Sequence, residues 1–91
     1  MEVVLDRVAG LDVHRDQVTA CARVPRSSAG RSSVVAEFST TAGGLAALGS
    51  WLSDAGVSHV AMEATGIYWR PVFFALEDSF ELMLVNAAHM R

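Results

Sequence analysis

The spacing of apolar residues first changes near residue 41, from the alternation typical of strands to the three-to-four spacing typical of a helix. Before that point, an apolar run from Val3 to Val13, strongest from Val8 onward, is followed by a second run from Gln17 to Val24. The polar pair Arg15-Asp16 between them is short enough for a hairpin turn, which predicts antiparallel neighbours. A third strand is predicted from Ser33 to Ser39, which completes a three-stranded meander.

A helix is predicted over residues 41–55, with Thr40 or Thr41 as its N-cap and Gly56 as its stop. A short apolar strand, His59 to Glu63, follows it. Because the chain reaches this strand through a helix, we expect a crossover and a parallel pairing with an earlier strand. The apolar positions that define the helix are Leu45, Leu48, Leu52 and Ala55.

The last part of the chain predicts a second helix, marked by Trp69, Val72, Phe73 and Leu76, and a fifth strand from Glu81 to Asn86. The resulting order is strand, strand, strand, helix, strand, helix, strand. It is the order of the ribonuclease-H-like fold, an α/β fold with a mixed five-stranded sheet in which the first strand lies centrally beside the fourth.

Two carboxylates stand inside or just beyond apolar runs, Asp12 in the first strand and Glu63 at the end of the fourth. An ionised group in a buried strand is costly unless it is paired or binds a cation. Adjacent strands lie about 4.8 Å apart, so carboxylates at matched heights on one face could hold a divalent cation between them. Asp12 and Glu63 are therefore the candidate metal ligands.

Composition narrows the setting in which such a site would work. The chain has 91 residues, 52% of them hydrophobic, which suits one small domain. Its net charge of −3 excludes a strongly basic field for binding nucleic acid, so any such contact must be local. The single Cys21 cannot form an intrachain disulfide, and no apolar run approaches the roughly 20 residues of a membrane span. We expect a cytoplasmic protein without a membrane partner.

Four stretches resemble one known family: Gly10-Leu11-Asp12-Val13-His14, Phe38-Ser39-Thr40-Thr41, Met62-Glu63-Ala64-Thr65-Gly66-Ile67-Tyr68-Trp69 and Val85-Asn86-Ala87. Together they resemble the RuvC-like DEDD transposases, or recombinases, of insertion-sequence family 110. The resemblance implies an N-terminal nuclease-like domain whose four acidic residues bind Mg²⁺ and act on DNA. It also implies a separate C-terminal domain with a catalytic Ser, and a structured guide RNA. Asp12 matches the first acidic residue and Glu63 the second.

The family's last two Asp residues belong to a segment that would follow Arg91. The resemblance therefore implies that residues 1–91 are the N-terminal portion of a RuvC-like domain. We expect the longer protein to be an enzyme and this portion alone to be inactive. We also expect apolar surface to remain open on the sheet, with self-association into a homo-oligomer as its remedy.

Further residues are candidates for contact with nucleic acid. Thr65 and Gly66 follow Glu63 and either shape the turn there or contact a phosphate. Arg23, Arg26 and Arg31 cluster around a Ser-rich hairpin and either contact phosphates or are simply exposed in a turn.

The sequence leaves the roles of four other side chains open. His14 is either a ligand or proton shuttle beside Asp12, or a partly exposed residue at a strand end. Tyr68 and Trp69 could stack on bases, but Trp69 shares an apolar stripe that favours core packing. Cys21 is expected to be a small buried hydrophobe.

Two other functions compete with a metal-dependent strand-transfer domain. A nucleotide-binding phosphotransferase of the actin and sugar-kinase type shares the core topology, but such proteins follow the first-strand Asp with a glycine-rich phosphate hairpin. Here Asp12 is followed by Val13-His14-Arg15-Asp16, which contains no glycine. The remaining alternative is a non-catalytic module for binding nucleic acid or protein, in which the acidic pair is vestigial.

Overall fold

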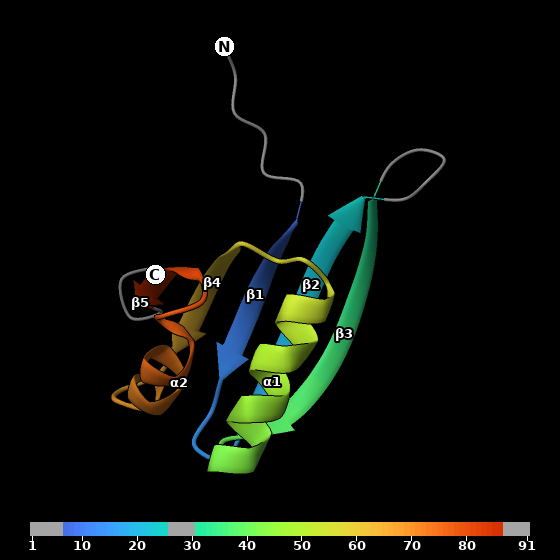
Figure 1. The fold of residues 1–91 in the computed structure, drawn as a ribbon. Helices are drawn as coiled ribbons and strands as arrows, with labels where there is room; N and C mark the ends of the chain where they lie inside the picture. Colours follow the sequence, from blue (N-terminus) through green and yellow to red (C-terminus); the bar gives the residue numbers. More distant parts are fainter. Residues whose placement is uncertain (1–6, 26–30, 87–91) are drawn as a thin grey trace.

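A computed structural model describes residues 7–25 and 31–86. Within them, strands β1, β2 and β3 form a meander, α1 crosses over to β4, and α2 leads to β5 (Figure 1). The five strands form one sheet in the order β3-β2-β1-β4-β5. The meander pairs are antiparallel and β1–β4 is parallel, as predicted. The β4–β5 pair is parallel as well. The elements are β1 (Val8–Val13), β2 (Gln17–Pro25), β3 (Arg31–Ser39), α1 (Ala42–Asp54), β4 (His59–Ala64), α2 (Trp69–Leu76) and β5 (Glu81–Asn86).

The observed bounds of β5 are the predicted ones, and those of β2, β3, α1 and β4 differ from the prediction by one or two residues. The β2–β3 ladder continues to the pair Pro25–Arg31, so both strands extend further toward the hairpin than their apolar runs suggest. Proline is tolerated there because it stands at the end of its strand. Strand β1 begins at Val8, and the earlier part of the predicted first strand, residues 3–6, lies outside the described residues.

One face of the sheet carries the core, because alternate residues of each strand point toward the two helices. In β1 these are Ala9, Leu11 and Val13, and in β4 they are Val60, Met62 and Ala64. Helix α1 packs near β3 and α2 near β4 and β5 (Figure 1). Burying each large apolar side chain contributes about 1.5–3 kcal/mol. The helices bury Leu45, Leu48, Leu52, Val72 and Leu76 against this face.

The opposite face of the sheet has no helix over it among the described residues. Val35 of β3 and Met83 of β5 are 62% and 63% exposed, so apolar surface is open there, as expected. This face is called the open face below. The expected self-association stays a prediction.

Both ends of α1 are fixed by local contacts. Thr41, not Thr40, is the N-cap, and its hydroxyl accepts a hydrogen bond of 3.1 Å from the Gly44 N–H. At the other end, Gly56 has a φ of 73°, the left-handed conformation that commonly ends helices. The Arg7 guanidinium donates a 2.8 Å hydrogen bond to the Ala55 carbonyl. The crossover from β3 to β4 is therefore held at both ends.

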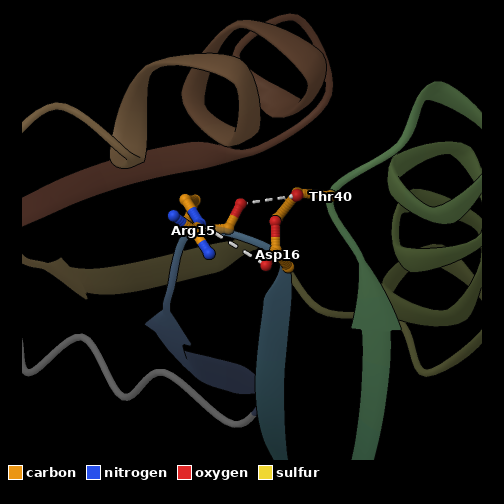
Figure 2. Close-up of polar contacts among 3 residues, drawn as sticks. All are labelled: Arg15, Asp16 and Thr40. Carbon is orange, nitrogen blue, oxygen red and sulfur yellow. Dashed lines mark hydrogen bonds and ion pairs between the residues drawn. The ribbon is translucent and has the colours of Figure 1, made fainter.

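The β1–β2 turn is attached to the junction between β3 and α1. The Thr40 hydroxyl donates to the Arg15 carbonyl at 2.8 Å (Figure 2). The Thr40 N–H donates to the Asp16 carbonyl at 3.2 Å. Within the turn, the His14 N–H donates to the Gln17 carbonyl at 2.8 Å. The Arg15–Asp16 ion pair is long, at 3.5 Å, and both side chains are exposed, so it contributes little. Thr40 therefore holds the turn that follows Asp12.

Two neighbouring glycines of α1 provide a matched test of the junction between β3 and α1. A Cβ on Gly44 would overlap the carbonyl and the hydroxyl of Ser39, whereas a Cβ on Gly43 would meet nothing within 4 Å. We expect Gly44→Ala to lower the free energy of unfolding by about 1–3 kcal/mol. Gly43→Ala should leave it unchanged or raise it by up to about 1 kcal/mol, since alanine favours helix. Urea denaturation measures both, and equal effects would contradict the predicted overlap.

Replacing Thr40 tests the attachment of the turn. Thr40→Val keeps the shape of the side chain but removes the hydroxyl donor, which should cost about 0.5–1.5 kcal/mol and speed hydrogen exchange at the His14 amide. Thr40→Ser retains the hydroxyl and serves as the control. If the two variants exchange equally fast at His14, the hydrogen bond to the Arg15 carbonyl does not hold the turn.

Candidate metal site

Asp12 and Glu63 are direct partners in the parallel ladder between β1 and β4. Their sequence neighbours Leu11 and Met62 are buried beneath the helices, so the two carboxylates point to the open face. Neighbouring strands are about 4.8 Å apart. The structure therefore brings together the two residues that the sequence singled out, on adjacent strands and at the same height.

The Asp12 carboxylate is accessible, with 60% of its side chain exposed. The sequence suggested a buried, desolvated position, and that interpretation is wrong because the apolar neighbours of Asp12 take the other face of the strand. His14 lies two residues further along on the same face, and its Nε2 is 3.2 Å from Asp12 Oδ2. The contact orients the Asp12 side chain from the β1 side, while Glu63 approaches from β4.

Thr19 is a site residue that the sequence analysis missed. It is the partner of Asp12 across the antiparallel β1–β2 pair, is half-buried, and is itself paired with Glu37 of β3. A shallow depression of about 390 Å³ on the open face is lined by Asp12, Thr19 and Glu63. The signal was available: counting back from a hairpin centred on Arg15-Asp16 pairs position 12 with position 19.

Thr65 and Gly66 immediately follow β4 and are exposed at the same edge of the sheet as the end of β1. Gly66 has a φ of 63°, a left-handed conformation that a glycine adopts without strain, so it shapes the turn, which is one of the two roles considered for it. Contact of Thr65 or Gly66 with a phosphate stays a prediction. The turn leads directly into α2, which begins at Trp69.

Of the three arginines proposed for phosphate contact, only Arg23 is described in full, and it lies away from the carboxylates. Arg23 pairs with Val8, at the opposite end of β1 from Asp12. Arg26 lies outside the described residues, and of Arg31 only the backbone, in β3, is described.

The prediction that Cys21 is a buried core residue is wrong. Cys21 is half-buried on the open face, opposite Gly10. The reason is the phase of β2, whose alternate residues Ala20 and Ala22 take the buried positions.

The residues present suit a partial site for a hard divalent cation. Among residues 7–25 and 31–86, no group of three or more His, Cys, Asp and Glu side chains is arranged to hold a metal. Mg²⁺ commonly uses only one or two protein carboxylates, together with water and substrate phosphates. Asp12 and Glu63 fit that requirement.

None of the described helices is long and apolar enough to cross a membrane.

Solved structures share this fold at low sequence identity. RuvC of Thermus thermophilus matches with a TM-score of 0.61 and 12% identity, over 88% of this chain and 63% of its own. The Fowlpox virus resolvase, solved with its substrate Holliday junction DNA, has a TM-score of 0.61 and 8% identity, over 88% of this chain and 60% of its own. An exopolyphosphatase from Cytophaga hutchinsonii has a TM-score of 0.59 and 11% identity, over 91% and 35%. The chain thus spans less than two thirds of each, and the likeness establishes the ribonuclease-H-like fold.

A search of curated protein sequences gives no significant match. The sequence profile of the IS110 family of DEDD transposases, described as "Transposase", matches residues 9–91. This range includes Asp12, Glu63 and all five strands except the first residue of β1. The chain therefore belongs to the IS110-type DEDD transposase family.

Proposed function

We propose that this chain is the N-terminal portion of a RuvC-like catalytic domain that cleaves and transfers DNA strands, with Asp12 and Glu63 as ligands for Mg²⁺. The observation that carries the proposal is the pairing of Asp12 with Glu63 on adjacent parallel strands, with both side chains on the open face. Membership of a transposase family supports DNA as the substrate. A structured guide RNA and a second copy of the chain are the further partners that we propose for the longer protein.

A divalent ion held by these carboxylates would polarise a phosphodiester and stabilise the charge that develops on its oxygens. The chain's own residues prepare for this in three ways. Asp12 and Glu63 present oxygen ligands from two strands, His14 orients the Asp12 carboxylate, and the Thr19 hydroxyl borders the depression. Two carboxylates leave further ligand positions to water and phosphate, and we propose that later acidic residues of the longer protein take some of them.

The phosphotransferase alternative is supported by the fold alone, through the likeness to the exopolyphosphatase. A shared topology does not determine function. The turn after β1 contains no glycine, and its His14 N–H already donates to the Gln17 carbonyl. A phosphate-binding hairpin needs free backbone N–H groups, so the turn argues for the strand-transfer function.

Magnesium binding by the purified chain is the most direct test. We expect Asp12→Asn and Glu63→Gln each to lower Mg²⁺ affinity about tenfold or more, because loss of a direct ligand should cost at least as much as loss of a supporting residue. NMR titration with Mg²⁺ measures the affinity and shows which amides respond. The expected shifts are at the ends of β1 and β4.

Glu37→Gln is the matched control for this titration. Glu37 is an exposed glutamate at the same height in the sheet, but Thr19 of β2 lies between it and Asp12. The Glu37 variant should bind Mg²⁺ as the parent chain does. If the Asp12 and Glu63 variants titrate no differently from it, the carboxylate pair is not the metal site.

The activity itself belongs to the longer transposase. There, Asp12→Asn or Glu63→Gln should reduce Mg²⁺-dependent DNA strand transfer to background without changing the circular dichroism spectrum, since each change keeps the shape of the side chain and removes a charge. The 91-residue chain alone should not nick supercoiled plasmid, because it provides only two of the proposed metal ligands. Its net charge of −3 also gives it little non-specific affinity for DNA. Nicking by the chain alone that depends on Asp12 would show that this pair suffices.

A further inference from the structure

Two apolar side chains are exposed on the loop that leaves the candidate metal site. Ile67 is 67% exposed and Tyr68 is 40% exposed, and they lie four and five residues after Glu63. Single exposed apolar residues are ordinary, but here two adjacent ones lie on the loop that begins after the strand of a proposed metal ligand. Their position suggests contact with whatever lies at the site.

The structure separates Tyr68 from its neighbour Trp69, which the sequence could not do. Trp69 is half-buried and packs edge-to-face on Phe73, with ring centroids 5.6 Å apart. On its outer side, the Arg70 guanidinium carbon lies 5.7 Å from the centroid of the Trp69 ring. Trp69 thus helps to pack α2 against the core, whereas Tyr68 is exposed.

The loop is ordered by its own backbone as well as by the packing of Trp69. Gly66 takes the left-handed conformation, and the Arg70 N–H donates to the Ile67 carbonyl at 3.2 Å. Ile67 and Tyr68 are therefore presented on a short, defined turn. A side chain held in place before binding loses less conformational entropy when it meets a ligand.

The loop and the β1–β2 turn occupy the same edge of the sheet, because β1 and β4 are parallel and both end there (Figure 1). Asp12 and Glu63 are each the residue before the last of their strand. An exposed cation, Arg15, lies in the turn at this edge, and Arg70 follows the loop in the first turn of α2, with its guanidinium over the Trp69 ring. Carboxylates that hold a cation, an exposed arginine and an exposed aromatic ring together suit a strand of nucleic acid.

We infer that Ile67 and Tyr68 form a platform on which an unpaired nucleobase stacks, next to the phosphodiester that Asp12 and Glu63 engage; the inference rests on the function proposed above. Stacking on an aromatic ring tolerates any base, because every base has a π-face. It also needs no basic field, which agrees with a net charge of −3. Ile67, the next exposed apolar residue in the sequence, would add apolar surface to the platform.

The test uses a single-stranded DNA oligonucleotide that carries 5-iodouracil, with Mg²⁺ at low ionic strength. Irradiation should cross-link the parent chain at Tyr68, which peptide mass spectrometry identifies without any substitution. In fluorescence anisotropy, Tyr68→Ala should weaken binding about tenfold, whereas Tyr68→Phe, which keeps the ring, should bind as the parent does. A fully paired duplex should bind more weakly than the single strand.

Phe74→Ala is the matched control, because Phe74 is a 62% exposed aromatic residue of α2 that faces the groove between the two helices. It should not change DNA binding. A cross-link elsewhere, equal losses from Tyr68→Ala and Tyr68→Phe, or a Tyr68→Ala variant that binds like the parent would overturn the platform. If Glu63→Gln still removes the Mg²⁺-dependent part of binding, the proposed function survives that result. A parent chain that binds no single-stranded DNA with Mg²⁺ overturns the platform, whereas the proposed function is decided separately by the Mg²⁺ titration and by strand transfer in the longer protein.

Discussion

The parallel pairing of β1 with β4 is the interaction on which the candidate site depends. Met62, completely buried under the helices, holds β4 in a single register against β1. Since side chains alternate along a strand, a slip of one residue would turn Glu63 toward the helices and expose Met62. The penalty for burying the carboxylate there unpaired, added to the loss of Met62 from the core, excludes that register. The core therefore determines where the acidic pair lies.

The crossover helix makes this pairing possible, and its two ends explain how the edge of the sheet is organised. At one end Arg7 caps the carbonyl of Ala55, next to the left-handed Gly56. At the other, Thr41 caps the helix while Thr40 holds the β1–β2 turn. The second end is at the same edge as Asp12 and His14, so contacts that start the helix also fix the surroundings of the site. The hydrogen bonds of Thr40 and Thr41 therefore both stabilise the fold and position the turn beside the site.

The element order and the Asp12–Glu63 pairing could be predicted from the sequence, because hydrophobic periodicity and a two-residue hairpin leave few alternative topologies. Finer features could not. The accessibility of Asp12 depends on which face the helices cover, and periodicity does not specify it. The separation of Tyr68 from Trp69 depends on where α2 begins, since one residue turns a side chain by about 100° around a helix. Thr19 was within reach of the sequence, through the hairpin register alone.

The fold is shared with a resolvase and with an exopolyphosphatase, so the sheet itself does not select the chemistry. The difference must come from what the two connections at the C-terminal edge of β1 and β4 present. After β1, the His14 N–H of the turn donates to the Gln17 carbonyl, and the turn is attached to Thr40. The turn therefore presents the His14 imidazole, and this N–H is not free to bind a phosphate. After β4, the loop exposes the side chains of Ile67 and Tyr68. If the proposals above hold, this edge recognises both parts of a nucleotide, the phosphate through a cation at the carboxylates and the base through stacking on the loop. A small inorganic phosphate would leave the aromatic loop without a partner, and this is the physical reason to favour a nucleic-acid strand as the substrate.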